Sequence, residues 1–100
     1  MEITRAKYFP RQSINANTFD GTYQALGSPI TEKAVLIKVV NNSDQLIDIS
    51  TDGTTDEDVA PANSYYLYDM DNFSFPRNQQ LYVKGNDGTG LVYLVIITEV

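Results

Sequence analysis

The chain has 100 residues, 42% of them hydrophobic, which is enough for one compact domain. It contains no cysteine and no histidine, so disulfides, thiolate metal ligands and the commonest general base are excluded. Seven basic and thirteen acidic residues give a net charge of −6, which disfavours nucleic acid as a partner.

The charge is unevenly distributed along the chain. Residues 1–19 hold three basic residues and one acidic residue, a balance of +2, whereas residues 20–100 hold four basic and twelve acidic residues, a balance of −8. The basic start and a polar run without strand pattern over residues 11–20 predict an N-terminal arm or extended segment over residues 1–20. The folded domain is then expected over residues 21–100.

The start of the chain also bears on its location. The N-terminal sequence MEITRAKYF lacks the apolar core of a signal peptide. The longest apolar run, residues 91–97, is too short to span a bilayer. We therefore expect the chain to be made and kept in the cytoplasm, with no membrane partner.

The first half of the chain contains strand patterns and no convincing helix. A weak strand pattern at residues 2–9 and a short one at residues 22–26 precede the first strong strand, AVLIKVV, at residues 34–40. Asn, Ser and Asp at residues 41–44 predict a turn, because their side chains hydrogen-bond locally. Residues 46–51 alternate apolar and polar side chains, so this strand and the one before the turn are expected to form a hairpin.

The second half continues in the same way. Further strands are expected at residues 64–70, 80–84 and 91–98, with the glycine-rich segment 85–90 as the hairpin loop between the last two. About six to eight short antiparallel strands predict an all-β, single-domain β-sandwich or a jelly-roll-like barrel.

Two of the strands, at residues 34–40 and 91–97, are apolar on both faces. A two-layer sandwich normally leaves one face of each sheet in water, so the second apolar face needs a cover, and a neighbouring subunit is the simplest one. The residues predicted to be mostly buried are Val35, Ile37, Val39, Ile47, Ile49, Leu67, Leu81, Val83, Tyr93 and Val95.

Three features that resemble chemical sites have simpler explanations. Asp52, Asp56 and Asp58 do not have the spacing of a calcium loop, so we expect no metal site there. The glycine-rich segment 84–90 leads into a strand and lacks the ending of a phosphate-binding loop. With no histidine and no nucleophile elbow, the sequence predicts a protein that is not an enzyme and needs no cofactor.

Aromatic residues cluster in one part of the chain. Strand alternation places Tyr65 and Leu67 on one face and Tyr66 and Tyr68 on the other. Tyrosines of this kind either complete a core and its rim or anchor an interface, and both interpretations remain open.

Residues 37–70, IKVVNNSDQLIDISTDGTTDEDVAPANSYYLYDM, combine an apolar strand, an Asn-rich turn, a strand ending in ISTDG, an acidic loop, a PANS turn and a strand ending in LYD. This pattern resembles small structural proteins of tailed bacteriophages. With the upstream GTYQALGSPI and the downstream YVKG and GTG, the resemblance covers roughly residues 20–100. It implies a virion component: a capsid decoration or cement protein, or a head–tail or tail joining module, assembled in the host cytoplasm.

We therefore expect a homo-oligomer or lattice component whose partners are copies of itself and other virion proteins. A carbohydrate-binding β-sandwich of an adhesin, with Tyr66, Tyr68 and Asp69 as its platform, is the alternative from a different class. The arm and one sheet face are expected to make the contacts, which gives these interface candidates: Arg5, Lys7, Tyr8, Phe9, Arg11, Tyr66, Tyr68, Phe73 and Phe75.

Overall fold

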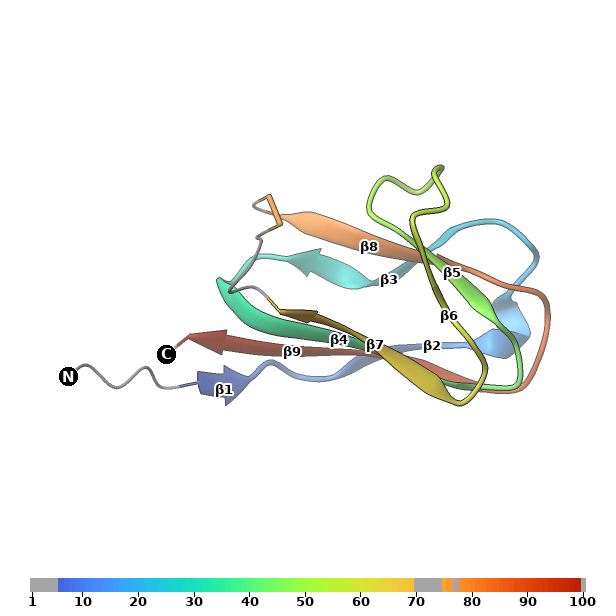
Figure 1. Ribbon diagram of the computed structural model, residues 1–100, viewed down its shortest axis with the longest axis horizontal. Coiled ribbons are helices and arrows are strands. Elements are labelled where there is room, and N and C mark those ends of the chain that lie inside the picture. The colour runs from blue at the N-terminus through green and yellow to red at the C-terminus, as the bar shows by residue number, and fades with distance from the viewer. Residues whose placement is uncertain (1–5, 70–74, 77, 100) are drawn as a thin grey trace.

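The computed structural model describes residues 6–69, 75–76 and 78–99, and in that part of the chain it is an all-β protein (Figure 1). One short 3₁₀ helix is the exception. The elements are β1 (Ala6–Tyr8), β2 (Gln12–Asn15), η1 (Ala16–Thr18), β3 (Gln24–Ile30), β4 (Ala34–Ser43), β5 (Ile47–Ser50), β6 (Asp58–Ala60), β7 (Ser64–Asp69), β8 (Gln79–Lys84) and β9 (Gly90–Glu99).

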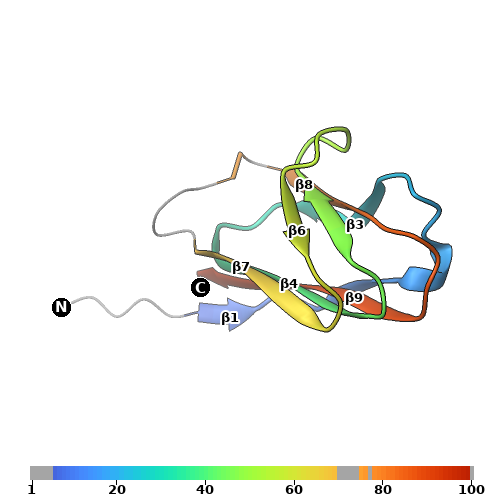
Figure 2. The same ribbon diagram turned by 45° about the vertical axis from the view of Figure 1, so that its right-hand side comes forward.

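The strands form two antiparallel sheets that pack face to face, as Figure 2 shows. A five-stranded sheet has the order β1-β9-β4-β7, with β2 also paired to β9, and a four-stranded sheet has the order β3-β8-β5-β6. Without β1, the order β2-β9-β4-β7 against β3-β8-β5-β6 is that of a jelly roll. The predicted sandwich is confirmed, and the two sheets share no paired strands among the described residues, so they do not close into a barrel.

The two predicted hairpins are wrong. β4 and β5 lie in different sheets, and so do β8 and β9; among the described strands, only β5 and β6 follow one another in sequence and pair. The predicted turn at residues 41–44 is also displaced, because β4 continues as strand through Ser43. The chain then crosses from one sheet to the other, and hydrogen bonds made by the side chain of Asn41 hold that crossing in place.

Residues 6–20 lie along the edge of the sandwich. β1 pairs Tyr8 with Ile97, and β2, within the run predicted to lack a strand, pairs Ile14 with Val92. After η1, Phe19 is 3% exposed and belongs to the core. This segment is therefore part of the fold, through strand pairing before η1 and through the buried Phe19 after it.

The core between the sheets contains six of the ten residues predicted to be buried. Val35, Tyr93 and Val95 are instead half-buried, and Leu67 is 46% exposed. In β9 the inward face is the opposite of the predicted one, because β4 pairs its inward residues Ile37 and Val39 with Ile96 and Leu94. The confirmed core residues are Ile37, Val39, Ile47, Ile49, Leu81 and Val83.

Candidate protein-interaction surface

The five-stranded sheet has one face toward the core and one face toward solvent, and we call the second its outer face. Residues that are paired across neighbouring strands share a face, so the register of β4 with β7 and β9 determines which side chains meet there. Three rows make up the outer face: Tyr65–Val40–Tyr93, Leu67–Lys38–Val95 and Asp69–Leu36–Ile97.

The outer face is apolar and partly open to water. Tyr65 is 65% exposed and Leu67 46% exposed, while Tyr93 and Val95 are half-buried by their neighbours in the sheet. Lys38 lies in the middle of the three rows. An apolar sheet face of this kind on a small protein is a candidate surface for protein contacts.

Two cations lie over aromatic rings of this face. The guanidinium of Arg11 lies 4.6 Å from the ring centroid of Tyr93, and the ammonium of Lys38 lies 5.9 Å from that of Tyr65. These are cation–π distances, so both cations lie close to the apolar surface. The outer face therefore combines hydrophobic area with positive charge in a chain whose net charge is −6.

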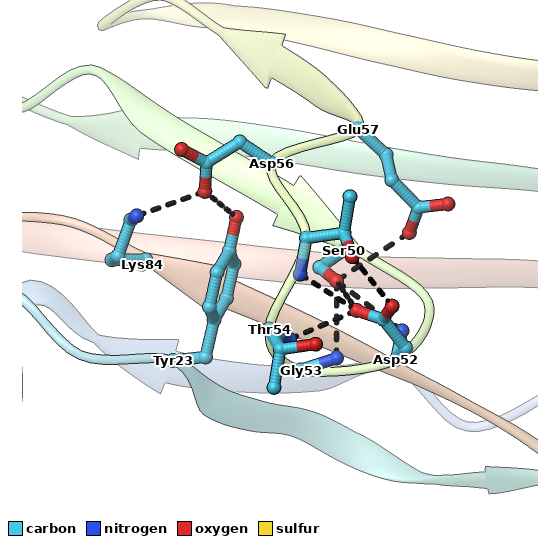
Figure 3. A network of polar contacts seen from close by, with 9 residues as sticks. Tyr23, Ser50, Asp52, Gly53, Thr54, Asp56, Glu57 and Lys84 are labelled. Atoms are coloured by element: carbon cyan, nitrogen blue, oxygen red, sulfur yellow. Dashed lines mark hydrogen bonds and ion pairs between the residues drawn. The ribbon is translucent and has the colours of Figure 1, made fainter.

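The solvent side of the four-stranded sheet differs, because the loop of residues 51–57 packs against part of it (Figure 3). A Cβ atom added at Gly53 would lie 3.5 Å from the ring of Tyr82, on β8. Asp56 accepts hydrogen bonds from Lys84, at 2.8 Å, and from the hydroxyl of Tyr23. In the described part of the chain, no comparable loop covers the outer face of the five-stranded sheet (Figure 1).

The carboxylates of this loop hold its backbone in place. Asp52 accepts hydrogen bonds from the main-chain N–H groups of Thr54 and Thr55, both at 2.8 Å, and these bonds hold the pKa of Asp52 well below its usual range. Glu57 accepts from the N–H of Thr51 at 2.6 Å, which lowers the pKa of Glu57 in the same way. Figure 3 shows the bonds to Asp52 converging inside the loop.

The three aspartates weighed as metal ligands have separate partners. Asp52 accepts from its own loop, Asp56 from Lys84, and Asp58 from the hydroxyl of Tyr68 at 3.2 Å. No group of three or more metal-binding side chains occurs among the described residues.

The aromatic candidates of β7 lie on its inward side. The rings of Tyr66 and Tyr68 are 4.9 Å apart, and the ring of Phe75 lies 5.6 Å from that of Tyr68. Tyr68 and Phe75 are half-buried and pack against the core. Burial, with a smaller contribution from Asp58, raises the pKa of Tyr68. The predicted division of Tyr65 and Leu67 from Tyr66 and Tyr68 is confirmed, but the aromatic pair is the one that faces the core.

The candidates near the N-terminus divide between two surfaces. Tyr8 is 73% exposed and pairs with Ile97, which extends the outer face across β1, and Arg11 reaches the same face over Tyr93. Lys7 is exposed. Phe9 packs against the core, and its N–H donates to the carbonyl of Ile96 at 2.9 Å.

Two of the predicted interface residues, Arg5 and Phe73, lie outside the described residues. Conversely, the set of candidates omitted every residue of the three outer-face rows, among them Tyr65, Leu67, Tyr93 and Val95. Because both faces of residues 91–97 are apolar, the sequence indicated an exposed apolar surface on this strand. It did not indicate which of the two faces is exposed.

Comparisons with protein-family models, with curated proteins and with solved structures gave no match. Among the described residues, no helix has the length and hydrophobicity needed to cross a membrane.

A groove of about 560 Å³ opens at the edge where β2 and β3 approach each other. Its lining includes the apolar side chains of Phe9, Pro29, Ile30 and Ile96, with Glu32 as its acidic member. It lies between the sheets rather than on the outer face, and its lining contains none of the outer-face rows.

Proposed function

We propose that the protein is a non-enzymatic structural component that assembles with copies of itself through the outer face of its five-stranded sheet. The observation that carries this proposal is the difference between the two solvent-facing sides of the sandwich. One side is partly covered by the polar loop of residues 51–57, and the other presents apolar rows across three strands.

Burial of the outer face supplies the driving force. Removing apolar surface from water stabilises a contact by roughly 25 cal/mol per Å². Tyr65 and Leu67 would contribute most, because they are the most exposed side chains of the three rows.

Charge favours a second copy as the partner. Lys38 and Arg11 place positive charge on the outer face, whereas residues 20–100 carry a balance of −8. An acidic surface of a neighbouring copy complements these cations. A contact of this type joins different surfaces of the two copies and can repeat from one copy to the next.

The setting we propose is the virion of a tailed bacteriophage, where the protein would be a capsid decoration or cement protein or a head–tail or tail joining component. Other virion proteins would be its further partners, with assembly in the host cytoplasm. The resemblance over residues 20–100 supports this setting, and so does a cysteine-free chain, which suits a reducing compartment. Mass spectrometry of purified phage particles tests the setting. Peptides of this chain in the particles would support it, and their absence would contradict it.

The carbohydrate-binding alternative needs an open aromatic platform at Tyr66 and Tyr68. Their rings pack against each other, and the hydroxyl of Tyr68 donates to Asp58. This arrangement favours a structural role for the pair.

Sedimentation velocity of the full chain, from low to high micromolar concentration, tests self-assembly. We expect reversible association that Val95→Lys, at the centre of the outer face, weakens by about tenfold or more. Val59→Lys is the matched control, because Val59 is 42% exposed on β6 of the other sheet. A wild-type chain that stays monomeric throughout this range would contradict the proposal.

A further inference from the structure

The five-stranded sheet ends at β7, which pairs with β4 and with no other strand among those described. A strand at the end of a sheet presents a row of unpaired N–H and C=O groups that another strand can pair with. Proteins usually protect such edges with proline, charge, bulges or very short strands.

The other edges of this sandwich carry such protection. β3 contains Gly27, at φ +71°, and Pro29, and its register with β8 is irregular between Leu26 and Ile30. β6 has only three residues and begins with Asp58. On the opposite edge of the five-stranded sheet, Pro10 separates β1 from β2.

β7 has none of these features over residues 64–68, which contain no charge, no proline and no glycine. Its six residues pair with β4 in unbroken register, from Asn41 opposite Ser64 to Leu36 opposite Asp69. Three consecutive side chains are also exposed: Tyr65 at 65%, Tyr66 at 37% and Leu67 at 46%. An unbroken edge with exposed apolar side chains and no charge over residues 64–68 is suited to strand addition.

We propose that β7 pairs antiparallel with β7 of a second copy, about a two-fold axis at Tyr66. This inference rests on the proposed function, because it names one edge through which copies join. The axis at Tyr66 places Tyr65 opposite Leu67 of the other copy and Ser64 opposite Tyr68, so every paired residue from 64 to 68 is uncharged.

A second copy fits this edge for two reasons. An isologous contact uses the same patch twice, and a patch without charge avoids repulsion between two chains that each carry a net charge of −6. In addition, Tyr65 and Leu67 belong to both the edge and the outer face, so the pairing continues the outer face from one copy into the next. A strand from a different protein is the competing occupant, and it predicts no contact between β7 strands in the purified chain.

Disulfide trapping tests the pairing directly, because the chain has no cysteine of its own. Opposed residues on paired strands have Cβ atoms about 4.5–5.5 Å apart, close to the separation that a disulfide needs. We expect an equal mixture of the Tyr65→Cys and Leu67→Cys proteins to form a mixed disulfide dimer under mild oxidation. The control is Leu46→Cys, at a position 54% exposed in the turn between β4 and β5.

A charge substitution gives a second measurement, which tests the edge and the outer face together. Lys on an edge strand opposes strand addition, so Leu67→Lys should weaken association in sedimentation velocity by about tenfold. Leu46→Lys makes the same change at a more exposed site and should leave association unchanged. Circular dichroism of each variant checks that the fold persists.

The outcomes separate this inference from the proposed function. If the wild-type chain associates but the mixture cross-links no more than the Leu46→Cys control, β7 pairing is overturned while assembly through the outer face stands. Normal association of Leu67→Lys would contradict both, because Leu67 belongs to the edge and to the outer face. If the wild-type chain does not associate at all, both fail.

Discussion

The side-chain nitrogen of Asn41 lies 3.0 Å from the main-chain oxygen of Ala60, and this hydrogen bond joins the two sheets where the chain crosses between them. The same nitrogen lies 2.7 Å from the carbonyl of Gln45 and 3.1 Å from that of Pro61, while the side-chain oxygen accepts from the hydroxyl of Ser43 at 2.6 Å. Asn41 is fully buried. Its polar atoms all have partners, as a buried amide requires.

Replacing this amide by a carboxyl group should destabilise the protein. Asn41→Asp removes the donor for three carbonyl groups and places a carboxylate in the interior, so we expect the free energy of unfolding to fall by about 3 kcal/mol or more. Urea denaturation followed by circular dichroism measures the change. Asn42→Asp, at the exposed neighbouring position, should stay within about 0.5 kcal/mol of wild type. Equal losses for both variants would contradict this account of the crossing.

Gly90 and Gly21 allow a comparison of two glycines at positive φ. Gly90 has a φ of +104°, and an added Cβ would lie 2.3 Å from the main-chain oxygen of Asn42. Gly21 has a φ of +84°, with nothing within 4 Å of the added atom. Gly21→Ala should therefore cost about 1–2 kcal/mol for the backbone conformation alone. Gly90→Ala should cost more, because the backbone of β4 must also move. Thermal unfolding measures both variants, and similar melting temperatures would contradict the prediction.

Several features of the fold follow from local sequence pattern. Residues 46–51 have one polar face, so alternation alone assigns Ile47 and Ile49 to the core. Turn residues locate most strand ends. The composition of the two sheets, however, depends on which strands pair with each other. Local pattern does not reveal this for β2, because its mostly polar residues pair with β9, which lies far away in the sequence.

The inward face of β9 shows the same limit. Both faces of residues 91–97 are apolar, so burial of Leu94 or of Tyr93 is equally compatible with the pattern, and only the register with β4 decides. The turn between β4 and β5 depends on hydrogen bonds from Asn41 to groups as far away as Pro61. The candidate surface was therefore predictable as an excess of apolar residues, but not as a specific set of side chains.

Truncation of neighbouring residues in β9 tests which face is inward. Ile96 is 2% exposed, so Ile96→Ala should lower the free energy of unfolding by about 2–5 kcal/mol. Val95→Ala removes a half-buried side chain from the outer face and should cost less in the monomer. Urea denaturation, at a protein concentration too low for self-association, gives both values. The reverse order would mean that the inward face of β9 is misassigned.

Acid should destabilise the end of the sandwich where Asp44 meets Thr89. The main-chain N–H of Thr89 donates to Asp44 at 2.9 Å, and its hydroxyl donates at 3.1 Å; these bonds lower the pKa of Asp44. A carboxyl group whose pKa is lower in the folded state stabilises the fold above its unfolded pKa, about 3.9. That stabilisation is lost as the pH falls through the folded pKa. Asp44→Asn should therefore reduce the loss of stability below about pH 4, measured by urea denaturation across pH, and an unchanged pH profile would contradict it.

The central claim, that the outer face of the five-stranded sheet is covered by another copy, is tested most directly by hydroxyl-radical footprinting at low and high protein concentration. Tyrosines are the reporters, since the chain has seven and no tryptophan. Tyr65 and Tyr93 lie on the outer face, and Tyr82 lies on the solvent side of the four-stranded sheet. The account predicts that oxidation of Tyr65 and Tyr93 falls as concentration rises while that of Tyr82 stays constant; protection of Tyr82 alone, or of none of the three, would contradict it.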